Sequence, residues 1–105
     1  MHPDKKFTER MLEEGYLLPH KLPTGKWVGC FQMNFTGGLF VGLDNSGYEK
    51  RYCYETIYGA MAACLTWDGE GDPPGNWIKE KGNGIDRINP NIMENIYDRL
   101  EEDLG

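Results

Sequence analysis

The segment between Trp27 and Trp67 constrains the fold more than any other part of the chain. It contains three runs rich in aromatic and β-branched residues, separated by two short breaks: the runs are 26–33, 39–43 and 48–54, and the breaks are Thr36-Gly37-Gly38 and Asn45-Ser46-Gly47. Glycine and asparagine tolerate the positive φ angles that hairpin turns need. The pattern therefore predicts three antiparallel strands joined by tight turns.

The alternation of side chains along these runs assigns the two faces of the sheet. A three-residue first turn sets apolar residues opposite one another, with Phe31 facing Leu43, and a one-residue slip would bury polar side chains instead. An even-length second turn sets Val41 against Tyr52. One face is then expected to carry Trp27, Phe31, Met33, Leu39, Val41, Leu43, Tyr52 and Tyr54. The reverse face is expected to carry Val28, Cys30, Phe40 and Cys53 among Gln32, Asn34 and Arg51.

A helix is predicted from Thr56 to Trp67, with Thr56 as its N-terminal cap. Apolar residues recur there at helical spacing and form one stripe: Ile57, Ala60, Met61, Cys64 and Leu65. Glycine and alanine residues between them allow a close approach to the sheet. We expect this stripe to pack on the aromatic face and to form the core.

The flanking segments predict two further helices and one short strand. Residues Pro3 to Glu14 predict a first helix that Gly15 ends, and residues 16–19 follow as an apolar arm. Residues 68–76 are rich in glycine, proline and acids and predict a loop. Residues 77–81 predict an edge strand, and Gly82-Asn83-Gly84 a break.

A terminal helix is predicted over residues 91–105. Asn89 serves as its cap, Pro90 stands at its first position, and its acidic end is expected to fray. Its apolar stripe consists of Met93, Ile96, Tyr97 and Leu100. The predicted fold is thus one α+β domain, residues 1–105, in the order α-β-β-β-α-(β)-α. Its small antiparallel sheet has three strands, or four with the edge strand, and a central helix on one face.

The net charge of −6 is concentrated at one end of the chain. From Glu94 onward five acids stand against Arg99 alone, a balance of −4, so the preceding 93 residues carry only −2. This acidity disfavours non-specific binding to phosphate backbones unless basic residues cluster locally. No apolar run is long enough for a transmembrane helix, and the start lacks a secretory signal, so we expect a cytoplasmic protein without a membrane partner.

Three cysteines, Cys30, Cys53 and Cys64, lack the spacing of a metal site. Their apolar surroundings indicate reduced, buried thiols, and a disulfide between Cys30 and Cys53 on the reverse face is the alternative.

The acids Asp68, Glu70 and Asp72 alternate with glycines like the first half of a calcium loop. A full loop needs glycine at its sixth position and a carboxylate at its twelfth, where this chain has Pro73 and Lys79. We therefore expect a solvated connection, with no metal and no cofactor. The two histidines, His2 and His20, have no matching nucleophile context, so we expect no catalytic residues.

A second cluster comprises Trp77, Lys79, Lys81 and Arg87. In an extended segment Trp77, Lys79 and Lys81 share one face, and an aromatic platform with two cations suits a nucleic-acid strand or an acidic partner. The alternative is that Trp77 closes the core beneath the loop while the lysines protect an exposed sheet edge.

The chain also resembles small uncharacterised proteins of phages, prophages and other mobile elements. The residues that carry the resemblance are Gly25-Lys26-Trp27, residues 47–54, Ala60 with Ala63, and residues 67–73 with Gly75-Asn76-Trp77. Such proteins typically read G-[KR]-W, then G-Y-x-x-R-W-C-[YF], then W-D-G-x-G-x-P-x-G-W. This chain has Tyr52 in place of the second tryptophan and an inserted Asn76. The resemblance implies no known activity.

These observations predict a non-enzymatic, cytoplasmic interaction module of mobile-element type, with an unknown protein partner. Its half-apolar reverse sheet face and terminal helix predict a homodimer. Two alternatives remain. One is a nucleic-acid-binding module that uses Trp77, Lys79, Lys81 and Arg87. The other is a small ligand-binding protein or enzyme built on the loop from Asp68 to Asp72.

Overall fold

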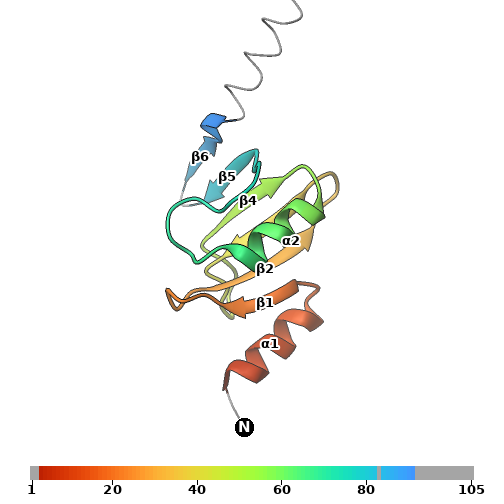
Figure 1. Ribbon diagram of the computed structural model, residues 1–105. Coiled ribbons are helices and arrows are strands. Elements are labelled where there is room, and N and C mark those ends of the chain that lie inside the picture. Colours follow the sequence, from red (N-terminus) through yellow and green to blue (C-terminus); the bar gives the residue numbers. More distant parts are fainter. Residues whose placement is uncertain (1–2, 83, 92–105) are drawn as a thin grey trace, which may run out of the picture.

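The computed structural model describes residues 3–82 and 84–91 and shows two helices and six strands (Figure 1). The elements are α1 (Pro3–Glu13), β1 (Leu17–Lys21), β2 (Trp27–Gln32), β3 (Gly37–Val41), β4 (Lys50–Tyr54), α2 (Ile57–Thr66), β5 (Lys79–Gly82) and β6 (Ile85–Ile88). The strands form one antiparallel sheet in the order β1-β2-β3-β4-β5-β6, so each strand pairs with its neighbour in sequence.

The α+β class is confirmed, but the sheet is larger than the predicted three or four strands. The arm after α1 is strand β1, and the break at Gly82-Asn83-Gly84 joins β5 to β6. At the predicted terminal helix, the Asn89 side chain accepts a hydrogen bond from the Asn91 N–H at 3.0 Å. The rest of that helix, including Met93, Ile96, Tyr97 and Leu100, lies outside the described residues.

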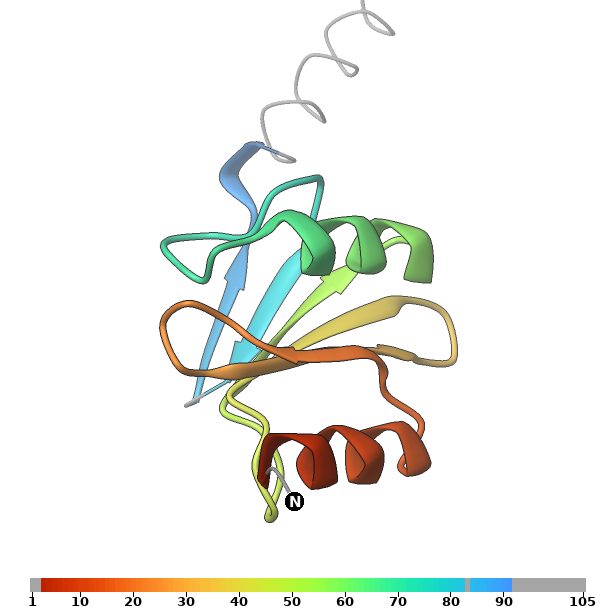
Figure 2. The ribbon, with the colours of Figure 1, turned by 60° about the horizontal axis from the view of Figure 1, so that its bottom comes forward.

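The two helices lie on opposite faces of the sheet (Figure 2). Against α2 the buried residues are Leu22, Val28, Cys30, Leu39, Val41, Tyr52, Tyr54, Ala60, Ala63, Cys64, Trp67 and Trp77. On the face of α1 they are Met11, Phe40 and Leu43, with Phe7, Tyr16, Trp27, Phe31 and Met33 packed around them. Each face of the sheet thus contributes to a buried cluster, which a single helix could not achieve.

The predicted register between β2 and β3 is wrong. Val28 pairs with Val41 and Cys30 with Leu39, so the hairpin loop lies at residues 33–36, where the Met33 N–H donates to the Thr36 carbonyl at 2.9 Å. Gly37 and Gly38 belong to β3 instead of the turn. A Cβ on Gly37 would lie 2.4 Å from the Cα of Ile57, so glycine is required there for close packing of α2.

This register exchanges the two faces of β2. Val28 and Cys30, predicted on the reverse face, are buried under α2, while Trp27, Phe31 and Met33 lie on the face of α1. Within β3 and β4 the predicted faces are correct, although Leu39 pairs with Tyr52 and the register differs by two residues. Leu43, which follows β3 and was predicted on the same face as Leu39, lies on the face of α1 instead. Since side chains alternate with period two, an even shift preserves the faces and an odd one reverses them.

Helix α2 begins as predicted, with the Thr56 hydroxyl accepting from the Gly59 N–H at 3.4 Å. Its buried residues are the small Ala60, Ala63 and Cys64, so the helix lies close to the sheet. Leu65, predicted in the core stripe, is 66% exposed, because the helix presents its small residues to the sheet and Leu65 lies on the outer side. None of the helices within residues 3–82 and 84–91 has the length and apolar character needed to cross a bilayer.

Candidate interaction surface

The structure separates the residues of the predicted binding cluster onto two faces. Trp77 is 2% exposed and packs edge-on against Tyr52, with ring centroids 5.1 Å apart. The Arg87 guanidinium lies over the Trp77 ring, 5.0 Å from its centre. Lys79 and Lys81 lie on the opposite face of the sheet, and the Lys79 ammonium pairs with Asp86 at 3.2 Å. Trp77 is therefore a core residue and offers no platform beside the lysines.

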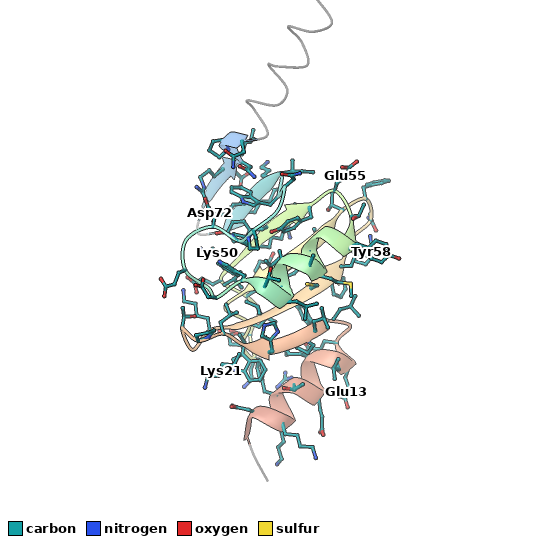
Figure 3. The ribbon with its side chains drawn as sticks, in the orientation of Figure 1. Glu13, Lys21, Lys50, Glu55, Tyr58 and Asp72 are labelled. Atoms are coloured by element: carbon teal, nitrogen blue, oxygen red, sulfur yellow. The ribbon has the colours of Figure 1, made fainter. Side chains whose placement is uncertain are left out.

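A polar network on the α2 side holds the loop between α2 and β5 against the sheet. Tyr52, Glu80 and Arg87 are direct neighbours across β4, β5 and β6. Arg87 donates to Glu80 at 3.3 Å and forms an ion pair with Asp72, which that loop carries (Figure 3). The Tyr54 hydroxyl also donates to the Pro74 carbonyl at 2.7 Å. Arg87 and Asp72 thus have a structural role.

Glu80 is the centre of this network. Besides Arg87, it faces the Lys50 ammonium at 3.7 Å and accepts a hydrogen bond from the Tyr52 hydroxyl. Burial and this hydrogen bond together raise the pKa of Tyr52 well above its ordinary value. The tyrosine therefore stays neutral and acts as a donor.

Asp68 closes a turn at the end of α2. Its carboxylate accepts from the Glu70 N–H at 2.9 Å, and the Trp67 indole donates to the Glu70 carbonyl at 3.2 Å. Within residues 3–82 and 84–91 no three histidine, cysteine or acidic side chains converge as they would around a metal ion.

The cysteines are free thiols in distinct environments. Cys30 and Cys64 are fully buried between β2 and α2, and their hydrogen bond, together with burial, raises the pKa of the Cys30 thiol. Cys53 is only partly buried and lies on the opposite face of the sheet from Cys30. The alternative disulfide between Cys30 and Cys53 is therefore incompatible with this fold.

The outer side of α2 is a surface that the sequence analysis missed. Its exposed residues Tyr58, Ala62 and Leu65 recur at i, i+4 and i+7, and we call them the α2 ridge. Met61 lies beside them, partly buried against the core. Tyr58 is 77% exposed and points away from the sheet (Figure 3). Helix α2 reads IYGAMAACLT and contains no charged residue. A helix without charged residues was detectable in the sequence, but Leu65 was assigned to the core stripe and Tyr58 was given no role.

A hollow lies on each side of the α2 ridge. One, of about 370 Å³, is lined by Leu18, Pro19, His20 and Leu65. The other, of about 240 Å³, lies between α2 and the following loop and is lined by Tyr54, Gly59, Ala62, Ala63, Thr66, Pro74, Gly75 and Asn76. The α2 ridge and the two hollows together form an uneven surface, and a partner's side chains can fill its hollows.

The first hollow is shaped by a bulge in β1 between Leu17 and His20. Leu18 has a φ of 54°, a left-handed conformation that is unfavourable for a leucine. Its carbonyl accepts hydrogen bonds from the His20 ring at 2.8 Å and from the Cys64 thiol at 3.7 Å, which hold the bulge in place. The bulge also interrupts the pairing of β1, so this edge strand is a poor template for adding another strand.

No protein-family model, no curated protein and no solved structure matches this chain. The geometry of its own surface is therefore the evidence for its function.

Proposed function

We propose that this protein is a non-enzymatic interaction module that forms a homodimer through the α2 ridge. The observation that carries the proposal is the exposure of Tyr58 and Leu65, 77% and 66%, on a helix without charged residues. Large apolar side chains that cluster on a surface mark interaction sites, whereas isolated ones need no explanation.

The distribution of charge permits a second copy of this chain as the partner. The chain carries −6, so two copies repel each other wherever acidic surfaces meet. A two-fold contact is isologous, which means that the same patch is used by both subunits. On an uncharged patch such as the α2 ridge, this symmetry brings no like charges together.

The shape of the ridge supports the same partner. Ala62 lies between Tyr58 and Leu65, and this small residue lets a second helix approach closely. The two projecting side chains of one copy can enter the hollows beside the ridge of the other. Aromatic anchors seated in such pockets contribute most of the binding energy in many interfaces.

Self-association is thus proposed as the sequence predicts it, but through the α2 ridge instead of the reverse face of the sheet. The face predicted to mediate it carries Val28, Cys30 and Phe40, and all three are buried beneath the two helices. A nucleic-acid site formed jointly by Trp77, Lys79, Lys81 and Arg87 is not proposed, since these residues lie on two faces. The resemblance of the sequence pattern to those of phage and mobile-element proteins supports a role in such an element, and free thiols support a cytoplasmic setting.

Sedimentation of ridge variants tests the proposal. Leu65→Lys places a charge within the contact and is expected to give a monomer with an unchanged circular dichroism spectrum. Leu12→Lys is the matched control, because Leu12 is a similarly exposed leucine, 53%, on α1. Loss of the dimer in both variants, or in neither, would contradict the assignment of the contact to the α2 ridge.

A further inference from the structure

The face of β4, β5 and β6 on the side of α1 is only partly covered: Asp86 and Ile88 on β6 are exposed, and the residues that β4 and β5 place there are half-buried. Two cross-strand rows lie on it: Phe40, Arg51, Lys81 and Asp86, and Gly38, Cys53, Lys79 and Ile88. Only Phe40, at the end of the first row, belongs to the cluster that packs with α1. We call the remaining residues, Arg51, Cys53, Lys79, Lys81, Asp86 and Ile88, the open face.

The open face is cationic in an acidic protein. It carries Arg51, Lys79 and Lys81 against Asp86, and the acid is already paired with Lys79. Arg51 donates one guanidinium N–H to the Tyr48 hydroxyl at 3.0 Å, while its buried Nε has no acceptor among the described residues. Within that part of the chain, neither Arg51 nor Lys81 has a carboxylate partner.

The open face is also partly apolar. Ile88 is 52% exposed, and Cys53 beyond Lys79 in the same row is only partly buried. An occupant that suits this surface combines an apolar stripe with flanking carboxylates. Apolar contact would remove Ile88 from water, and the carboxylates would pair with Lys81 and Arg51.

We propose that residues 92–105 of the same chain dock on the open face. Their sequence has the required composition, with Met93, Ile96, Tyr97 and Leu100 at helical spacing. Their acids, Glu94, Asp98, Glu101, Glu102 and Asp103, stand against Arg99 alone, a balance of −4. The cationic open face and the acidic segment 92–105 are therefore complementary in charge.

Connectivity permits this docking. The segment follows Asn91, three residues after the end of β6, which is the edge strand of the open face. As a helix it would extend about 21 Å at a rise of 1.5 Å per residue. The three strands lie about 4.8 Å apart, so the face is only about 10 Å across. The segment is thus long enough to reach β4, beside the region that α1 covers.

Cys53 provides a direct probe, because it lies on the open face while Cys30 and Cys64 are fully buried. We expect the Cys53 thiol of the full chain to react slowly with a thiol reagent. Truncation after Asn91 should raise its rate by about tenfold or more, because reaction of the covered thiol requires the segment to open first. Equal rates in the two chains would overturn the proposal.

Charge exchange tests the same contact without truncation. Lys81→Glu should raise the reactivity of Cys53, although an added negative charge near a thiol by itself slows thiolate chemistry. Combining it with Asp98→Lys should restore slow reaction. Lys21→Glu, which changes an exposed lysine on β1, is the matched control and should leave the rate unchanged. A lower rate in Lys81→Glu, or no restoration in the double variant, would contradict the docking.

A second copy of the chain or a nucleic acid could also protect the Cys53 thiol. These sources are distinguished from residues 92–105 by measuring the Cys53 rate in the Leu65→Lys variant, in which the proposed dimer is lost. Protection of Cys53 should remain there and should not depend on protein concentration. Protection that rises with concentration would assign the face to a second copy. Protection that requires added single-stranded oligonucleotide would assign it to nucleic acid. Either result would overturn docking of the chain's own segment.

Discussion

Gly37 lies directly beneath the first turn of α2, where a Cβ on it would come within 2.4 Å of the Ile57 Cα and 2.5 Å of the Thr56 carbonyl oxygen. These are backbone atoms, so no side-chain rotation can relieve the overlap. The distance between helix and sheet is therefore set by a glycine in β3.

Gly37→Ala is expected to destabilise the fold by about 3 kcal/mol or more, because α2 must move away from the sheet. Gly71→Ala is the control: its added Cβ meets nothing within 4 Å, although its φ of 65° is unfavourable for alanine. That strain costs about 1–2 kcal/mol. Urea unfolding measures the loss of stability in each variant. A Gly37→Ala variant as stable as Gly71→Ala would contradict the packing described.

The Gly37-Gly38 pair also shows where sequence reasoning reached its limit. Glycine serves turns and close packing alike, and only the position of α2 decides between them. Assigning the pair to a turn displaced the register of β2 and reversed its faces. The parity of β4, by contrast, was predictable, because Tyr52 and Tyr54 alternate with Arg51 and Cys53 around a glycine-containing turn.

Strands β1 and β6 were not predictable for a different reason. The sequence of β1 contains Pro19 and a bulge at Leu18, which removes the alternation that identifies a strand. Strand β6 is only four residues long and has two charged residues at its centre. Both are edge strands, whose sequences are shaped by the need to avoid further pairing. The α2 ridge was missed because an apolar residue on a helix fits a core and an interface equally well.

High pH is expected to destabilise the protein through Tyr52 and Tyr54. Burial raises the pKa of both hydroxyls above the ordinary value of 10.0. In the unfolded chain they ionise near that value, whereas in the fold they stay neutral, so their contribution to stability is complete below about pH 10 and is lost above it. Above that pH, each of the two hydroxyls lowers the free energy of unfolding by up to about 1.4 kcal/mol per pH unit.

Unfolding free energies between pH 8 and 11 measure this effect. Tyr52→Phe and Tyr54→Phe should each reduce the slope of the unfolding free energy against pH. A slope that neither variant alters would show that these hydroxyls do not control stability at high pH.

Arg87→Met is expected to release the loop between α2 and β5. The variant loses the ion pair with Asp72, the hydrogen bond to Glu80 and the cation–π contact with Trp77. Because the ion pair is exposed, the loss of stability should be only about 1 kcal/mol. Limited proteolysis within residues 68–76 should nevertheless accelerate. The control is Lys81→Met on the opposite face, and equal acceleration in both variants would contradict the role assigned to Arg87.

Native thiol titration is expected to find Cys30 and Cys64 reduced and unreactive. Both side chains are fully buried, and a raised pKa keeps the Cys30 thiol protonated. Both should react with a thiol reagent once the protein is unfolded in denaturant. Reaction of either cysteine at the rate of an exposed thiol would show that α2 does not cover β2 as described.

The mass of the wild-type protein in solution tests the central claim most directly. Sedimentation equilibrium over micromolar concentrations should give twice the 12.0 kDa of one chain, falling toward one chain on dilution. The apparent mass should change little with added salt, since the proposed contact is uncharged. A constant mass of 12.0 kDa throughout this range would contradict self-association through the α2 ridge.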